Sequence, residues 1–102
     1  MAVITIQHPV ADFDGWKKAF DSDPLGRAKS GVTRHAIYRG TTDPNFIVVH
    51  LEFASREQAE KFMPALQTMW QRVGGQLGFA GGAGVQARIL DEVERVEYTP
   101  TE

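Results

Sequence analysis

The sequence predicts an α+β fold in which a four-stranded antiparallel sheet carries two helices on one face. The first observation is the order of hydrophobic periods along the chain, which reads strand, helix, strand, strand, helix, strand. The second is the length of 102 residues, which suits a single domain spanning residues 1–102 with its own core. Two helices cover only one face of such a sheet. We therefore expect the bare face to be apolar and to drive self-association.

The composition narrows the class of protein. Hydrophobic residues make up 42% and charged residues 24%, which is typical of a globular domain. The net charge is −2 with no basic block, so nucleic acid is not an expected partner. The absence of cysteine excludes disulfides and thiolate metal sites. No apolar run approaches the roughly 20 residues that span a bilayer, and we expect a cytoplasmic protein with no membrane partner.

The first strand and helix follow each other closely. Val3–Val10 alternates as a strand that is mostly apolar on both sides, with Ile4, Ile6 and His8 on one face, and such a strand belongs in the middle of a sheet. Asp12 then occupies the position of an N-cap, so a helix is expected to begin near Phe13. Its apolar residues recur three to four apart and form the buried stripe Phe13, Trp16, Ala19 and Phe20.

A turn and a hairpin follow the first helix. Asp23 and Pro24 resemble a fresh N-cap with a first-turn proline, which predicts a short turn that ends at Gly31. Val32–Arg39 and Phe46–Phe53 are rich in strand formers, and the six residues between them have the composition of a turn. The second of these strands should place one wholly apolar face under the helices, formed by Ile47, Val49, Leu51 and Phe53.

The second helix has the strongest local pattern. Ser55 and Gln58 have capping-box spacing, and the helix that follows keeps its phase across Pro64, so a kink is expected there and not a stop. The apolar residues hold helical phase over about four turns. They are Ala59, Phe62, Met63, Leu66, Met69, Trp70 and Val73.

The last quarter of the chain contains a glycine-rich stretch and a final strand. Residues 74–84 lack charge and are expected to form a loop. From Val85 the pattern alternates as a strand and then slips in phase, as in a bulged strand or one that leaves its own sheet. Ile89, Val93 and Val96 also fit a helical period, so a terminal helix is the alternative, and we favour the strand.

Three segments resemble a known superfamily. HPVADFDGWKKAFDSDPLGR, TTDPNFIVVHLEFASREQAEKF and QARIL are similar to the small dimeric α/β-barrel proteins, which include antibiotic-biosynthesis monooxygenases and cyclase-like members. The resemblance covers residues 1 to about 98. It implies a ferredoxin-like sheet whose open face meets that of a second copy, with a pocket in each subunit between sheet and helices.

The resemblance also implies an activity. Members of known activity oxidise or cyclise aromatic, polyketide-like compounds, often without metal or flavin, and others degrade haem. The second helix of this chain, Arg56–Val73, contains no histidine to bind haem iron, so we expect no haem and no other cofactor.

The candidate catalytic residues lie on the expected hairpin. His50 could accept a proton from an acidic phenol or enol, while Arg34 stabilises the anion and Tyr38 donates a hydroxyl. The three share one face only in the register that sets His50 opposite Ala36, and in the other register His50 faces His35. A cross-strand salt bridge beside a packed tyrosine is the structural alternative.

Further residues are candidates for ligand binding. His8, at the end of the first strand, could polarise a substrate or cap the neighbouring helix. The helix aromatics could line a cavity for a flat ring, although their spacing also suits plain core packing. The three histidines are too scattered to predict a metal site. The full set of expected ligand-binding residues is His8, Trp16, Phe20, His35, Phe62 and Trp70.

Two functions remain compatible with the sequence. One is a small homodimeric enzyme, a cofactor-independent monooxygenase or cyclase acting on an aromatic or polyketide-like molecule. The other is a non-catalytic ligand-binding or stress-related dimeric module, because every polar residue above also has a structural explanation. A polar cluster in an apolar setting favours the enzyme.

Overall fold

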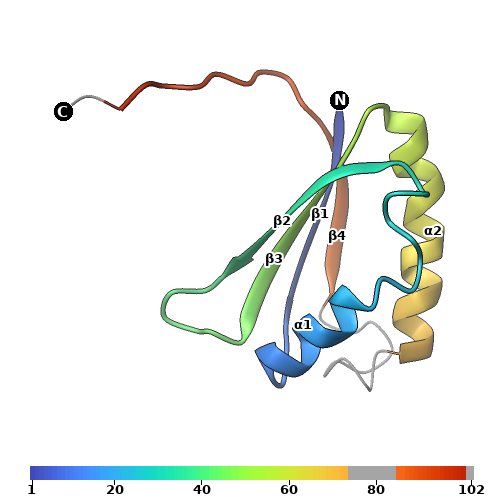
Figure 1. The fold of residues 1–102 in the computed structure, drawn as a ribbon, viewed down its shortest axis with the longest axis vertical. Coiled ribbons are helices and arrows are strands. Elements are labelled where there is room, and N and C mark those ends of the chain that lie inside the picture. The colour runs from blue at the N-terminus through green and yellow to red at the C-terminus, as the bar shows by residue number, and fades with distance from the viewer. Residues whose placement is uncertain (74–84, 101–102) are drawn as a thin grey trace.

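The computed structural model describes residues 1–73 and 85–100 of the chain, and its elements follow the predicted order (Figure 1). They are β1 (Ala2–Pro9), α1 (Phe13–Asp21), β2 (Val32–Arg39), β3 (Phe46–Phe53), α2 (Arg56–Val73) and β4 (Gln86–Asp91). The hairpin strands and α2 have the expected bounds, whereas β1 begins and ends one residue earlier than expected. The glycine-rich stretch at 74–84 lies outside the described residues.

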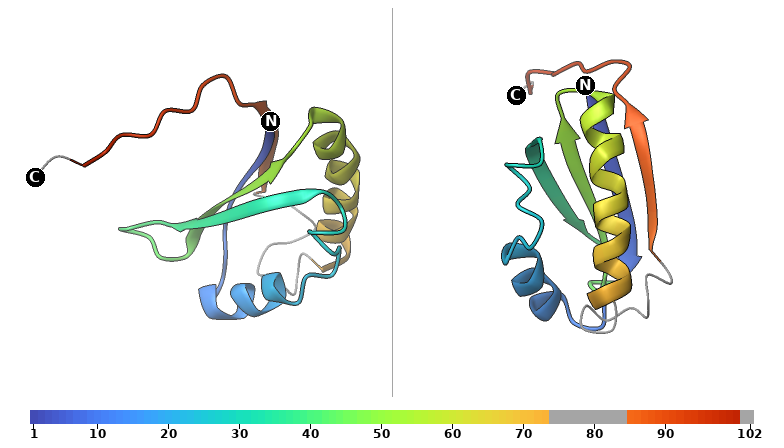
Figure 2. Two further views of the ribbon diagram at one scale, coloured as in Figure 1. Left: turned by 45° about the horizontal axis from the view of Figure 1, so that its top comes forward. Right: turned by 90° about the vertical axis from the view of Figure 1, so that its right-hand side faces the viewer.

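The four strands form one sheet in the order β2-β3-β1-β4, and every neighbouring pair is antiparallel. β1 therefore lies in the middle of the sheet, as its two apolar faces predict. Both helices lie on the same face, with α2 packed along the sheet and α1 beside it (Figure 2). This arrangement is the ferredoxin-like α+β fold.

The core lies between the sheet and the helices. The predicted inner face of β3 is buried throughout, and Ile4 on β1 pairs with Leu51 across the ladder. The helices contribute Trp16, Ala59, Phe62, Leu66 and Trp70 as buried residues. Other members of the predicted stripes, including Phe13, Phe20, Met63 and Met69, are partly buried around this cluster. The alternation and helical spacing therefore identified the core correctly.

Both helices begin at the predicted caps. The Asp12 carboxylate accepts a hydrogen bond from the Gly15 backbone nitrogen at 2.9 Å, and the Ser55 hydroxyl accepts one from the Gln58 nitrogen at 3.3 Å. Each bond satisfies a donor that the first helical turn leaves without an intrahelical partner. Pro64 lies inside α2, and the helix continues past it as expected.

The segment after α1 is a series of turns. Asp23 has a left-handed backbone with φ of 51°, and its carboxylate accepts from the Arg27 backbone nitrogen at 2.9 Å. The Ser30 hydroxyl donates to the Leu25 carbonyl at 3.0 Å, and Gly31 closes the segment with φ of 102°. Asp23 thus caps a turn, but Pro24 does not open a helix. The segment ends where the sequence predicted.

The hairpin adopts the first of the two predicted registers. His50 lies opposite Ala36, Arg34 opposite Glu52, and Tyr38 opposite Val48. A register shift between Val32 and Arg34 marks a bulge at the start of β2. Gly40 follows β2 in a tight connection, where a side chain would collide with the Asp43 carbonyl.

Among the described residues, no helix covers the second sheet face, and its composition differs from the expectation. By strand register it carries Val3, Thr5, Gln7, Arg34, Ala36, Tyr38, Phe46, Val48, His50, Glu52, Gln86, Arg88 and Leu90. The expectation of a plainly apolar face is therefore wrong, because polar side chains alternate with apolar ones across neighbouring strands. We call this surface the open face.

The C-terminal residues leave the sheet. β4 ends at Asp91, and residues 92–100 form neither helix nor strand, so the alternative of a terminal helix is wrong. The phase slip in the sequence marks the point at which the chain departs. We call residues 92–100 the C-terminal arm. In Figure 1 it extends away from α2, on the side of the sheet opposite to the helices.

Candidate functional site

The predicted catalytic residues lie on the open face, and two of them are in contact. The rings of Tyr38 and His50 are in edge contact, with centroids 5.1 Å apart and planes at 62°. Arg34 binds Glu52 with two hydrogen bonds, Nη2 to Oε1 at 3.0 Å and Nε to Oε2 at 3.2 Å. The register thus brings the three residues to one face, as predicted, but the guanidinium is already paired with a carboxylate.

Glu52 is the electrostatic centre of this group. It also accepts from the Arg95 Nη2 at 3.1 Å, so two guanidinium groups share one carboxylate. The hydrogen bond from Arg34 holds the pKa of Glu52 below its usual value, against the opposing effect of desolvation. The same bond raises the pKa of Arg34. The geometry corresponds to a salt bridge beside a packed tyrosine, and His50 is not among the residues that line the cavity under the helices.

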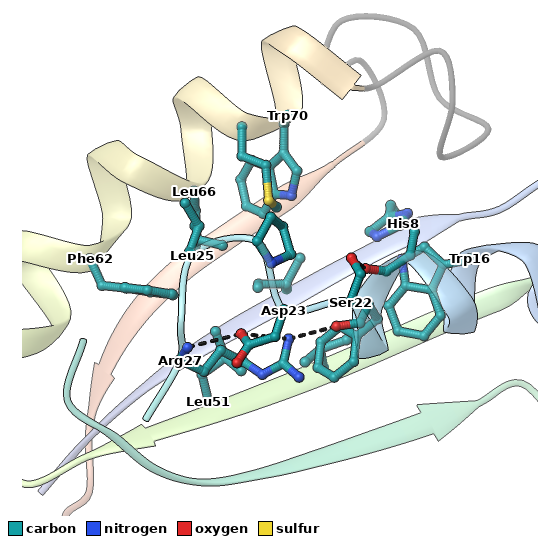
Figure 3. A pocket seen from close by; sticks show the side chains of 16 residues that line it. His8, Trp16, Ser22, Asp23, Leu25, Arg27, Leu51, Phe62, Leu66 and Trp70 are labelled. Carbon is teal, nitrogen blue, oxygen red and sulfur yellow. Dashed lines mark hydrogen bonds and ion pairs between the residues drawn. The ribbon is translucent and has the colours of Figure 1, made fainter. Parts of the chain in front are cut away.

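A cavity lies on the opposite side of the sheet, under the helices (Figure 3). Its volume is about 230 Å³, and its walls come from β1, β3, both helices and the turn at residues 22–27. The lining is mostly aliphatic and aromatic. It includes five of the six residues predicted to bind a ligand, namely His8, Trp16, Phe20, Phe62 and Trp70.

His8 is the titratable group buried most deeply in this wall. Its side chain is on the helix face of β1 with Ile4 and Ile6, and it is 3% exposed. Nδ1 lies 2.9 Å from the Pro9 carbonyl oxygen, which can only accept, so the neutral ring carries its proton on Nδ1. Nε2 is then the basic nitrogen. Asp12, and not His8, caps α1.

Burial also sets the charge of His8. Desolvation lowers its pKa from the ordinary value of 6.5 and outweighs the opposing hydrogen bond to Pro9. The ring is therefore neutral at pH 7 and able to accept a proton. Trp16 packs against it edge-on, with ring centroids 6.2 Å apart, and limits its orientations.

The turn at residues 22–27 supplies a polar wall that the sequence did not identify. Arg27 lines the cavity, and its guanidinium donates from Nη1 to the Phe20 carbonyl at 2.9 Å and lies 3.5 Å from the Asp23 carboxylate. The same guanidinium lies 3.8 Å over the Phe20 ring. The only hint in the sequence is the spacing of four residues between Asp23 and Arg27, which does not indicate a cavity by itself.

His35 is the sixth predicted ligand-binding residue. It points to the helix side of β2, where its ring meets that of Phe20 with centroids 5.1 Å apart. It is exposed and is not part of the cavity wall. Its position puts it behind a lining residue, so any effect on a ligand would act through Phe20.

The described residues contain neither a metal-binding cluster nor a helix that could span a membrane. Within residues 1–73 and 85–100, no three histidine, aspartate or glutamate side chains gather closely enough to hold a metal ion. Neither helix in that part of the chain is long and apolar enough to cross a membrane.

Solved structures share this fold. SnoaB, a cofactor-independent oxygenase from Streptomyces nogalater, matches with a TM-score of 0.73 and 11% identity, over 95% of this chain and 97% of that chain. A dimeric ferredoxin-like protein from an uncultured marine organism matches with a TM-score of 0.66 and 12% identity, over 93% of this chain and 97% of that chain.

A third structure contains a ligand. It is a monooxygenase from Streptomyces coelicolor in complex with nanaomycin D, with a TM-score of 0.61 and 14% identity over 98% of this chain and 92% of that chain. No family model and no curated protein sequence matches the chain. At these identities the likeness establishes a shared fold, and function has to be argued from the site.

Proposed function

We propose that the chain is a cofactor-independent monooxygenase or cyclase that acts on an aromatic or polyketide-like molecule held in the cavity. The observation that carries the proposal is a neutral, buried histidine in the wall of an apolar, aromatic-lined cavity. Structures with the same fold include a cofactor-independent oxygenase and a monooxygenase in complex with nanaomycin D.

His8 is the proposed proton acceptor. Nε2 takes a proton from a phenol or from an activated C–H group of the ligand and leaves an electron-rich phenolate or enolate. In a cyclase that carbanion attacks a carbonyl of the same molecule. In an oxygenase it attacks O2, and oxidation of a methylene to a carbonyl releases one water. The ligand then supplies all the electrons, so no reductant is needed.

Arg27 is the proposed partner for the negative charge. Its guanidinium lies on the cavity wall beside aromatic and aliphatic groups, where poor screening strengthens its attraction for an anion. It already binds the Phe20 carbonyl and lies 3.5 Å from the Asp23 carboxylate, which hold it in place before the ligand arrives, and the anionic ligand would share it with Asp23. A fixed cation of this kind stabilises an enolate without reorganising.

The predicted base His50 remains a competing version of the proposal. With Arg34 and Tyr38 it forms a polar cluster on the open face, and it could serve a ligand enclosed between two copies of the chain. Because the cavity found under the helices does not include His50, we assign the proton transfer to His8. Separate substitutions of the two histidines decide between the versions.

We also propose that the chain works as a homodimer that joins two open faces. Val3, Phe46 and Val48 are partly covered there by their neighbours but have no helix above them. A solved protein of this fold is described as dimeric. Sedimentation at micromolar concentration should give twice the monomer mass, and a monomer would exclude this part of the proposal.

A second function is supported by the internal bonding of the cavity wall. His8 Nδ1 is paired with the Pro9 carbonyl, and the Arg27 side chain with the Phe20 carbonyl. Such pairing is also what a stable, non-catalytic ligand-binding or stress-related module requires. In that case the cavity binds an aromatic compound and returns it unchanged.

The test uses an anthrone, whose activated methylene becomes a carbonyl in the anthraquinone product. The purified chain is mixed with the anthrone in air-saturated buffer, and product is followed by its absorbance and by O2 uptake. We expect turnover that His8→Asn lowers by at least about 100-fold, within the range of general base catalysis. His50→Asn should keep turnover close to the wild-type rate.

The contrary outcomes separate the alternatives. Loss of turnover in His50→Asn alone would transfer the role of base to the open face. Anthrone binding measured by tryptophan quenching, without any turnover, would support the binding module. Far-ultraviolet circular dichroism of each variant checks that the fold is intact.

A further inference from the structure

We infer that the C-terminal arm of one chain packs on a second copy, so that two chains exchange arms. The inference rests on the proposed dimer and adds the segment that holds it together. It starts from Figures 1 and 2, in which the arm extends from the end of β4 away from the helix layer. That is the side of the sheet on which a second open face would lie.

The arm carries apolar side chains that its own chain does not cover. Val93 is 95% exposed, Val96 56% and Tyr98 88%, which makes three large apolar residues within a stretch of six. A tail that only has to remain hydrated does not need them, because polar residues serve that purpose at no cost in exposed apolar surface. Burial of Val93, Val96 and Tyr98 against a second copy would explain why the arm carries these apolar residues.

The base of the arm is fixed to its own sheet. The Glu92 backbone nitrogen donates to the Met1 carbonyl at 2.9 Å and extends the ladder between β4 and β1 by one bond. Arg95 then binds Glu92 at 2.6 Å and Glu52 at 3.1 Å, which directs the chain across the end of the open face. Among the described residues, Arg95 is the last in the arm whose side chain bonds to the sheet.

The arm is long enough to reach a partner. Beyond the anchor at Arg95, the five described residues 96–100 span about 16 Å when extended, at roughly 3.3 Å each. Packed sheets are about 10 Å apart, so three or four residues cross the interface and the remainder can lie along the other chain. Val96 and Tyr98 alternate with Arg95 and Glu97, which is the pattern of a strand with one apolar side.

The charges of the arm fit the surface it would meet. The arm carries Glu94 before its anchor at Arg95 and Glu97 beyond it, whereas β4 and β2 present Arg88 and Arg34 on the open face, where Arg34 also binds Glu52 of its own chain. β2 is also an edge strand with one unpaired side, to which an extended segment can add by backbone hydrogen bonds. A two-fold dimer would form this contact twice.

The experiment cross-links the arm. The chain has no cysteine, so Tyr98→Cys creates a single attachment point for a benzophenone photo-cross-linker. Labelled chains grown in ordinary and in 15N medium are mixed at micromolar concentration, left to exchange subunits and irradiated. We expect covalent dimers whose cross-linked peptides combine the two isotopes. Gln67→Cys, exposed on α2, is the matched control and should give no such dimers.

Removal of the arm gives a second measurement. A chain that ends at Glu92 keeps the hydrogen bond to Met1, and should retain its fold while the dimer dissociation constant rises at least tenfold. Cross-links confined to single chains, in a sample that sediments as a dimer, would overturn arm exchange but leave the dimer standing. An unchanged dissociation constant after truncation would also overturn it. The anthrone assay is independent of both measurements.

Discussion

Trp16 packs edge-on against His8, with ring centroids 6.2 Å apart and planes at 68°, and so helps to enclose an imidazole that is almost fully buried. The contact joins the first turns of α1 to the end of β1. It excludes water from the histidine, and exclusion of water lowers the pKa of the ring. The same packing thus keeps His8 neutral and places it at the cavity.

The pH dependence of turnover follows from this neutral ring. A proton acceptor must be deprotonated, so activity should fall as the pH falls through the pKa of His8. Since that pKa is lowered from 6.5, kcat/KM for the anthrone should be half-maximal at a pH below 6.5 and should rise from there to a plateau that extends to pH 8. A half-maximum above 6.5 would contradict the assignment of His8.

The stability of the fold should change over the same region of pH. The unfolded chain protonates His8 near its ordinary pKa of 6.5, whereas the folded chain resists protonation until a lower pH. Between these two values the unfolded state binds more protons, so the free energy of unfolding falls as the pH is lowered from 7. The stability that the chain gains from keeping His8 neutral is present in full above pH 6.5. It is lost progressively as the pH falls from 6.5 to the lower pKa of the folded chain.

Urea unfolding at pH 7.0 and 5.5 measures this effect. The wild-type midpoint should drop more between the two pH values than that of His8→Asn, because asparagine does not titrate. Equal drops in the two proteins would mean that His8 protonates as readily in the folded chain as in the unfolded one. Both proteins contain the same carboxylates, so the effect of carboxylate protonation on the midpoint cancels when the two drops are compared.

The buried face of the sheet could be predicted from the sequence more fully than the open face. The hairpin strands were assigned with correct bounds because Ile47, Val49, Leu51 and Phe53 alternate without interruption, and a shift by one residue would expose them all. The same period placed His8 with Ile4 and Ile6. Patterns of this kind can be predicted because they depend only on residues that are close together in the sequence.

The resemblance implied a pocket between sheet and helices, and five of the six expected ligand-binding residues line the cavity, but its polar wall could not be predicted in the same way. Its polar wall depends on the turn at residues 22–27, where the left-handed backbone of Asp23 turns the chain and brings Arg27 over the ring of Phe20. Nothing in the periodicity indicates that conformation. His50 is predicted to be a base because it is a polar residue in an apolar strand, and it lies on the open face, outside the cavity under the helices.

The prediction that Asp12 caps α1 can be tested by substitution. Asp12→Ala removes the acceptor that binds the Gly15 nitrogen at 2.9 Å and should lower the free energy of unfolding by about 1 kcal/mol. Asp12→Asn keeps a capping oxygen and should stay within about 0.5 kcal/mol of wild type. Urea unfolding at pH 7 compares the three proteins. A large loss in the asparagine variant would show that charge, and not capping, is what Asp12 supplies.

Arg27 and Arg39 form a matched pair for testing recognition of an anion. Each guanidinium lies over a phenylalanine ring, Arg27 at 3.8 Å from the centroid of Phe20 and Arg39 at 4.2 Å from that of Phe13, but only Arg27 lines the cavity. Methionine at either position keeps an unbranched apolar side chain and removes the charge. We expect Arg27→Met to weaken binding of a hydroxyanthraquinone at a pH where it is ionised by about tenfold, a loss of roughly 1.4 kcal/mol. Arg39→Met should bind it as the wild type does.

A neutral ligand serves as the control for the effect of ligand charge. Unsubstituted anthraquinone cannot ionise, so its affinity should change little in either variant, and tryptophan quenching can measure all four combinations. If Arg27→Met weakens both ligands equally, the guanidinium acts by holding the turn against Phe20 and not by meeting charge. If Arg39→Met weakens the ionised ligand as much as Arg27→Met does, the anion is bound outside the cavity.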